Sequence, residues 1–186
     1  QIYGLTKGQY SPTSEVGKKT KSTPMGSLDH PFNPISVALG AEATFVARAV
    51  DVDAKGLQSI IKRAAEHVGT AFVEVYQNCN IFNDGAFVHI SDRKQKVNNE
   101  LKLIHGEPLI FGANREKGIA LSDDMRPVIV NVEEHGVENL LVHDETNSAM
   151  AYFLSKLVHP DFPTPTGVFR AVKRPAYDAL MTDQLA

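Results

Sequence analysis

"TFVARAVDVDAKGLQSIIKRAAEHVGTAFVEVYQ", residues 44–77, is the stretch that decides the fold class. Its first and last eight residues alternate between apolar and polar positions and are rich in β-branched residues, a pattern typical of strands. Between them, apolar residues recur at helical spacing, at Leu57, Ile60, Ile61, Ala64 and Val68. Asp53 can cap the start of this helix and Gly69 can end it.

A further helix is predicted ahead of the first strand. Asn33 is a typical N-cap residue, and Pro34 suits the first turn of a helix over residues 35–43. The resulting order of helix, strand, helix and strand indicates an α/β fold with a parallel sheet and crossover helices. Ligands of such sheets gather at the carboxyl ends of the strands, which directs attention to the residues after Gln77.

The chain upstream of residue 35 is polar and irregular. Residues 1–3 are predicted to end a strand that runs into a loop over residues 4–14, and residues 15–34 form a long connection. Long connections inside compact domains are often functional. Its lysines, Lys18, Lys19 and Lys21, can be interpreted as contacts for a phosphate or an acidic partner, although a solvated charged surface is the favoured interpretation.

The second half of the chain has a different character. Short strands are predicted over residues 109–111, 118–121 and 128–132, as a small meander. Thr146 or Asn147 caps a helix with an apolar face, and a strand, "GVFRAV" at residues 167–172, and a short helix from Ala176 follow. We therefore divide the chain into residues 1–80, which carry the parallel sheet, and residues 81–186, a small α+β subdomain.

Composition excludes several classes of protein. The 186 residues carry a net charge of −3, which argues against a nucleic-acid-binding surface. No apolar run is long enough to span a bilayer. The single cysteine excludes an internal disulfide and fits a reducing, cytoplasmic setting. Because the chain does not begin with methionine, we expect it to be a fragment.

Two short stretches carry the candidate chemistry. The opening loop combines Gly4 and Gly8 with hydroxyl side chains and Lys7, a composition that suits an anion, although an ordinary polar surface loop is the favoured interpretation from composition alone. Cys79 lies between two asparagines just beyond the second predicted strand. A lone cysteine is more often a buried bystander than a ligand or nucleophile, so the residues alone leave its role open.

Other polar residues have simpler interpretations. The seven histidines show no metal-ligand spacing with each other or with Cys79. The run His143-Asp144-Glu145 is interpreted as a surface turn in preference to an acid–base site. Glu74 falls in a strand predicted to be buried, where its charge needs a partner. No catalytic residue is assigned from these patterns.

The opening motif "QIYGLTKGQYSPTSEVGKKTKSTPMG", residues 1–26, closely resembles the β subunits of the 2-oxoacid:ferredoxin oxidoreductases, the 2-oxoglutarate type in particular. Further similar motifs are "PFNPISVALGAEATFVAR", "VEVYQNCNIFNDGAF", "LLVHDE" and "TPTGVFRAV". The resemblance covers nearly the whole chain. It implies the thiamine-diphosphate-binding fold, of which residues 1–80 would be the C-terminal half, and a longer subunit of which this chain is the C-terminal part.

The resemblance also implies cofactor ligands. The carbonyl of Ile2 would bind Mg²⁺, Gly4 and Leu5 would touch thiamine diphosphate with Thr6 close by, and Cys79 would be one of four cysteines that hold a [4Fe–4S] cluster. The Gly-Asp-Gly motif that begins the family's thiamine site is absent here, as are the other three cysteines. We therefore expect this chain alone to hold neither cofactor fully.

The activity implied by the resemblance is the coenzyme A-dependent oxidative decarboxylation of a 2-oxoacid, with 2-oxoglutarate as the first candidate. Electrons would pass through the cluster to ferredoxin. A partner α subunit would complete the enzyme, as a heterodimer or a dimer of heterodimers. Two alternatives stay open: a non-redox thiamine-dependent decarboxylase or synthase, and a catalytically inactive interaction subunit.

Overall fold

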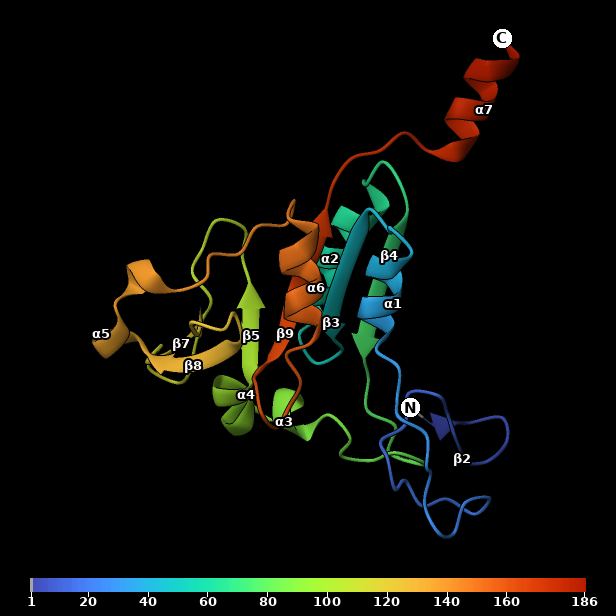
Figure 1. Cartoon of the computed structure of the whole chain (residues 1–186). Helices are drawn as coiled ribbons and strands as arrows, with labels where there is room; N and C mark the ends of the chain where they lie inside the picture. Colours follow the sequence, from blue (N-terminus) through green and yellow to red (C-terminus); the bar gives the residue numbers. More distant parts are fainter. Residues whose placement is uncertain (1) are drawn as a thin grey trace.

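The computed structural model describes residues 2–186, and a four-stranded sheet runs through its centre (Figure 1). The strand order across the sheet is β4 (Ala71–Tyr76), β3 (Phe45–Val50), β9 (Thr164–Ala171) and β5 (Glu100–Leu103). β3 and β4 are parallel, and α2 (Ala54–Ala65) connects them. The α/β class and the crossover predicted from residues 44–77 are thereby confirmed.

The sheet as a whole is mixed, because two strands from the second half of the chain join the parallel pair of β3 and β4. β9 runs antiparallel to β3 and parallel to β5, with a register shift between Val46 and Ala47. The alternation of residues 167–172 predicts a strand but carries no information on its direction. The direction depends on the end of the sheet at which the chain re-enters after α6 (Ser148–Ser155).

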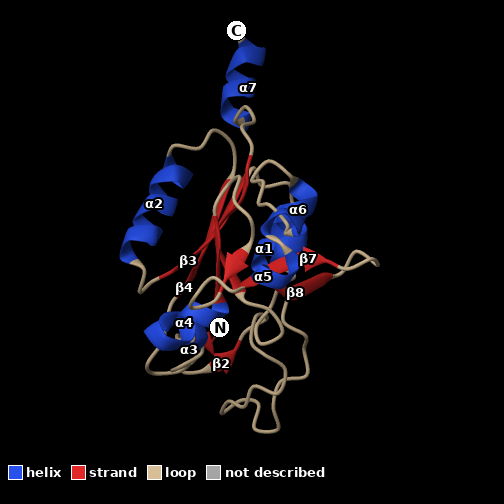
Figure 2. Ribbon diagram, turned by 90° about the vertical axis from the view of Figure 1, so that its left-hand side faces the viewer, coloured by secondary structure: helices blue, strands red, loops and turns tan. Residues whose placement is uncertain are grey.

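Helices cover both faces of this sheet (Figure 2). α1 (Pro34–Gly40) and α6 pack on one face, and the larger hydrophobic core lies beneath them, with Val46 and Phe169 among its fully buried side chains. α2 packs on the other face over a smaller core that includes Phe45 and Val168. The two central strands, β3 and β9, therefore contribute apolar side chains to both faces of the sheet.

The predicted N-caps are confirmed by their hydrogen bonds. The side-chain oxygens of Asn33, Asp53 and Asn147 each accept from the backbone N–H group three residues further on, at 3.0–3.1 Å. The Asn33 amide also donates to the carbonyl of Ser155 at 2.6 Å. One asparagine thus starts α1 and ties it to the end of α6.

The second half of the chain contains the predicted meander and several elements that the patterns did not predict. The meander is β6 (Ile110–Phe111), β7 (Lys117–Leu121) and β8 (Pro127–Asn131). The additional elements are α3 (Val88–Ser91), α4 (Arg93–Asn99), β5, α5 (Val132–His135) and the 3-10 helix Val137–Asn139. β5 and β9, from the second half of the chain, pair in the same sheet as β3 and β4. The division of the chain after residue 80 stays a prediction.

The two ends of the chain lie apart from the sheet. β1 (Ile2–Tyr3) and β2 (Gln9–Tyr10) form a small antiparallel ribbon near the lower end in Figure 1, whereas α7 (Tyr177–Leu185) stands off at the opposite end. Among the residues described, no helix is both long and apolar enough to cross a membrane.

A buried ion pair joins β3 to β4. Arg48 is 3% exposed, and its Nε donates to the carboxylate of Glu74 at 2.7 Å, which is the partner that Glu74 was predicted to need. The guanidinium also donates to the carbonyl of Pro165 on β9 at 3.1 Å and lies over the ring of Tyr76. Arg48 therefore links three strands, and its charge is almost fully shielded from water.

We expect Glu74→Ala to lower the free energy of unfolding by about 3–5 kcal/mol, because it leaves the buried Arg48 charge without its carboxylate. Denaturant titration of the protein measures this loss. Glu66→Ala is the matched control, since the Lys62–Glu66 pair is exposed and its atoms are 3.9 Å apart. That variant should change by less than about 0.5 kcal/mol. Equal losses in both variants would contradict the assignment.

Candidate functional site

Two loops meet beyond the carboxyl ends of β3 and β4. One is the opening loop between β1 and β2, and the other follows β4 and contains Cys79 (Figure 1). A Cβ atom built on Gly8 would lie 3.2 Å from the ring of Phe82. The ammonium of Lys18 donates to the side-chain oxygen of Asn83 at 2.6 Å. The sequence-predicted stretches are thus brought together at the expected edge of the sheet.

The opening loop is a tight, exposed turn. The N–H groups of Lys7 and Gly8 donate to the carbonyls of Gly4 and Tyr3, each at 3.0 Å, and the Thr6 hydroxyl donates to the Tyr3 carbonyl at 3.4 Å. The turn leaves the side chain of Leu5 98% exposed. A Cβ at Gly4 would meet nothing within 4 Å, so a ligand can approach this backbone closely.

The roles predicted for this turn stay predictions, but its shape fits them. Ile2 lies in β1 opposite Tyr10, directly ahead of the exposed residues Gly4, Leu5 and Thr6. Two of the hydroxyls that suggested an anion site are used elsewhere. Ser11 and Ser14 are buried, and the N–H of Ser11 donates to the Ser14 hydroxyl at 2.9 Å. These two serines shape the turn after β2.

The loop after β4 presents Cys79 at the surface. Its turn is closed by the N–H of Asn83, which donates to the Cys79 carbonyl at 3.0 Å. The Asn78 side chain donates to Asp84 at 2.8 Å and accepts from the N–H of Gly85 at 3.0 Å, so both ends of the loop are fixed. The sulfur is therefore exposed on a loop that is held by hydrogen bonds.

The electrostatics of this loop favour a thiolate. Hydrogen bonds from the backbone N–H groups of Phe82 and Ile81 lower the pKa of the Cys79 thiol, and the nearby carboxylate of Asp84 opposes them. The thiolate is the form of cysteine that binds metals. An accessible cysteine with a lowered pKa is compatible with a role as a thiolate ligand.

The lysines of the long connection face the same region. A hollow beside the two loops is lined by Lys7, Gly8, Lys18, Lys19, Thr20, Lys21, Ile81 and Phe82. Lys18 is only partly exposed and is hydrogen-bonded within the protein, whereas Lys19 and Lys21 are exposed. The interpretation as a solvated charged surface therefore holds for Lys19 and Lys21 but not for Lys18.

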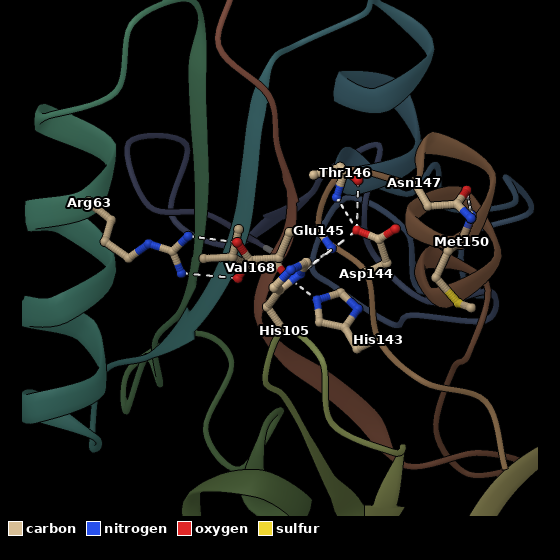
Figure 3. Close-up of polar contacts among 9 residues, drawn as sticks. All are labelled: Arg63, His105, His143, Asp144, Glu145, Thr146, Asn147, Met150 and Val168. Carbon is tan, nitrogen blue, oxygen red and sulfur yellow. Dashed lines mark hydrogen bonds and ion pairs between the residues drawn. The ribbon is translucent and has the colours of Figure 1, made fainter. Parts of the chain in front are cut away.

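The run His143-Asp144-Glu145 is not a simple surface turn, which corrects that interpretation (Figure 3). His143 is 1% exposed and its Nε2 donates to the carbonyl of Val168 at 2.8 Å. Burial lowers the pKa of its imidazole. Glu145 is buried and accepts two hydrogen bonds from Arg63, at 2.7 and 3.1 Å. These contacts attach the chain before α6 to β9 and α2, and they give the run a structural role.

The histidines do not assemble a metal site. His89 and His159 stack with ring centroids 4.2 Å apart, and burial together with the neighbouring imidazole lowers the pKa of His89 to about 4. In the part of the chain that the structure describes, no three His, Cys, Asp or Glu side chains are grouped so that they could hold a metal ion. A cluster on Cys79 would need ligands from outside these residues.

Comparison with known families gives a match to the first part of the chain. The family model described as thiamine pyrophosphate enzyme, C-terminal TPP binding domain, matches residues 1–75. This range includes the opening turn, α1, β3, α2 and most of β4. It ends just before the Cys79 loop.

Individual proteins extend the similarity to the whole chain. The chain is 49% identical, over its full length, to the 2-oxoglutarate oxidoreductase subunit KorB of Mycobacterium tuberculosis, of which it spans 50%. It is 48% identical over 83 residues to the 2-oxoacid:ferredoxin oxidoreductase subunit beta of Saccharolobus solfataricus, which is 45% of this chain and 27% of that protein. The chain spans at most about half the length of these curated relatives.

A solved structure has the same fold. The 2-oxoglutarate:ferredoxin oxidoreductase from Magnetococcus marinus, with 2-oxoglutarate, coenzyme A and succinyl-CoA bound, superimposes with a TM-score of 0.67 at 27% identity. The superposition covers 98% of this chain and 48% of that chain. The mixed sheet and the segments around it therefore follow an architecture already seen in an enzyme.

We expect the alkylation rate of Cys79 in the metal-free chain to rise at lower pH than that of a cysteine in a short peptide, because the N–H donors of Ile81 and Phe82 stabilise the thiolate. Iodoacetamide labelling followed by mass spectrometry across a pH series gives the midpoint. Asp84→Asn is the matched variant, since it removes the opposing charge and keeps an acceptor for Asn78. Its midpoint should fall further. A midpoint equal to that of the peptide would contradict the role of these N–H donors.

Proposed function

Since this chain belongs to the family of 2-oxoacid:ferredoxin oxidoreductase β subunits, we propose that it forms part of an enzyme that oxidatively decarboxylates a 2-oxoacid. The proposed substrate is 2-oxoglutarate, with coenzyme A as the acyl acceptor and ferredoxin as the electron acceptor. The observation that carries the proposal is the meeting of the opening turn with the Cys79 loop at one edge of the sheet. The closeness of these two loops supports a diphosphate-binding turn near a cluster ligand.

The opening turn would hold thiamine diphosphate through a few groups. The carbonyl of Ile2 would be one Mg²⁺ ligand, Gly4 and Leu5 would contact the diphosphate, and Thr6 would lie close to it. The open space at Gly4 and the exposure of Leu5 support this proposal. Mg²⁺ in such sites takes few protein ligands and completes its shell with phosphate oxygens and water. Thiamine diphosphate, when bound, supplies the electron sink for decarboxylation.

Cys79 would supply one thiolate ligand of a [4Fe–4S] cluster. Its exposed sulfur and the donors from Ile81 and Phe82 fit this role. The other three thiolates would come from outside this chain, which contains one cysteine. The chemistry of a thiolate-held cluster suits a reducing compartment, so we propose a cytoplasmic location.

Exposed apolar side chains near the site support contact with further protein. Leu5, Met25, Leu28 and Ile81 are each more than 75% exposed, and they lie upstream of α1 or in the Cys79 loop. Groups of exposed apolar side chains mark interaction surfaces. We propose that the rest of a longer β subunit and a partner α subunit cover them. Residues 1–80 would then belong to the thiamine-binding domain and residues 81–186 to a subdomain that supports it.

The two alternative functions make different demands on the same residues. A non-redox thiamine-dependent enzyme has no use for a thiolate at Cys79, and an inactive interaction subunit has no use for an open backbone at Gly4. The local donors around the sulfur and the open turn therefore favour the redox enzyme. Iron content and thiamine diphosphate binding of the whole enzyme separate the three possibilities.

Cys79→Ser tests the redox part of the proposal. In the whole enzyme, purified without oxygen, we expect ferredoxin reduction to fall by about 100-fold or more. Loss of a residue that only hydrogen-bonds to a metal ligand usually costs about 10–100-fold, and Cys79→Ser removes the ligand itself. The Kd for thiamine diphosphate, measured by calorimetry, should stay unchanged because Cys79 lies outside the opening turn. Ile81→Ala is the control, since it keeps the backbone donor. If the Cys79→Ser enzyme reduces ferredoxin at the wild-type rate, the assignment of Cys79 as a cluster ligand is wrong.

Gly4→Ala tests the thiamine part. The added methyl group has free space in the protein, so the stability should be unchanged, but it would stand between the backbone and the diphosphate. We expect the Kd for thiamine diphosphate to rise about tenfold, equivalent to about 1.4 kcal/mol. Gly40→Ala is the matched control, because its Cβ also meets nothing within 4 Å and it lies in α1. If both variants bind like the wild type, the opening turn does not hold the cofactor.

A further inference from the structure

Lys18 bonds to the loop after β4. In the described part of the chain, no such hydrogen bond is seen for Lys19 or Lys21, the other lysines of residues 15–34. The Lys18 side chain is 22% exposed, and its ammonium donates to the Asn83 side-chain oxygen at 2.6 Å and to Glu15 at 2.8 Å. The first bond joins the long connection after β2 to the loop after β4. Lys18 is therefore a link between the two halves of the proposed cofactor region.

The backbone around Lys18 is fixed, so the ammonium is presented from a defined place. The N–H of Lys18 donates to the hydroxyl of Ser27 at 3.1 Å, and the N–H of Ser27 donates back to the Lys18 carbonyl at 3.1 Å. Ser27 is buried, and its hydroxyl donates to the Glu15 carbonyl at 2.8 Å. What looked from sequence like an irregular connection is a closed loop with Lys18 directed at Asn83.

Asn83 is the residue that closes the turn around Cys79. Its N–H donates to the Cys79 carbonyl at 3.0 Å, and the two residues form an isolated β-bridge. A bond to the Asn83 side chain therefore acts on the geometry of the turn that presents the sulfur. A Cβ atom built on Gly8 would lie 3.2 Å from the Phe82 ring, so the loop between β1 and β2 also lies close to the loop after β4.

We propose that Lys18 is a positioning residue for the electron-transfer step: through Asn83 it holds the turn that presents Cys79 and so tunes the potential of the group bound there. This inference rests on the proposed function. The backbone N–H groups of Ile81 and Phe82 donate toward the Cys79 sulfur within this turn. Hydrogen bonds to the sulfurs of a thiolate-held cluster tune its potential. Because such donors offset the charge of the added electron, loosening the turn should shift the potential to more negative values.

The test compares lysines that line the same hollow. Lys18→Met, Lys19→Met and Lys21→Met are made in the whole enzyme, purified without oxygen, and each cluster midpoint potential is measured by redox titration followed by electron paramagnetic resonance. For Lys18→Met we expect the reduced-to-oxidised ratio at a fixed potential to fall about threefold, a shift of about 28 mV to more negative potential at 59 mV per tenfold change. Lys19→Met and Lys21→Met should shift by less than half as much.

Two further variants separate positioning from general damage. Lys18→Arg keeps a charged donor and should restore most of the wild-type potential. Asn83→Ala removes the acceptor, and its shift should not add to that of Lys18→Met in the double variant, because both remove the same bond. Iron content and the Kd for thiamine diphosphate are measured for every variant. A Lys18→Met potential equal to that of Lys19→Met, or an Asn83→Ala potential equal to the wild type, would overturn the inference.

The outcomes also distinguish this inference from the proposed function. A wild-type enzyme without a [4Fe–4S] signal would contradict the proposed function itself. A wild-type enzyme with the cluster and an unshifted Lys18→Met variant would contradict only the role of Lys18.

Discussion

The buried pair of Arg48 and Glu74 is the interaction on which the rest of the structure depends. A guanidinium that is almost fully excluded from water requires a carboxylate, and here the carboxylate is on the neighbouring parallel strand. The same guanidinium reaches a carbonyl of β9, so the relative positions of three strands are set together. β4 continues from Glu74 through Tyr76 to the Cys79 loop. The position of the Cys79 sulfur therefore depends on the position of β4 in the sheet.

The two parts of the candidate site are positioned in different ways: the Cys79 loop by the sheet, and the opening turn by contacts between loops. Parallel strands deliver the loop after β4 to the carboxyl edge without further contacts. The opening turn, in contrast, lies in a small ribbon outside the sheet, and its position relative to Cys79 depends on side-chain contacts such as those of Lys18 and Phe82. The two candidate cofactor regions are thus connected by a few described contacts.

Local patterns were sufficient for the elements whose causes are local. The spacing of Leu57, Ile60 and Ala64 predicts α2, and Asn33, Asp53 and Asn147 cap the helices as expected. Local patterns could not supply the direction of β9, the burial of His143 or the contact of Lys18 with Asn83, because each depends on residues distant in sequence. The roles assigned to Ile2, Gly4 and Cys79 came from family resemblance, since a turn or a lone cysteine does not specify a ligand.

The topology of the sheet also bears on how the protein folds during synthesis. One edge of β3 pairs with β4, which follows it closely, whereas the other edge pairs Phe45 with Ala171 near the end of the chain. The β3–α2–β4 unit can therefore form early, but the opposite edge of β3 has no partner until β9 leaves the ribosome. An open strand edge of apolar residues is prone to pair with other chains. The most buried strand of the protein thus completes its pairing only when β9 emerges, and the interval before then is when a nascent chain is most exposed to misassembly.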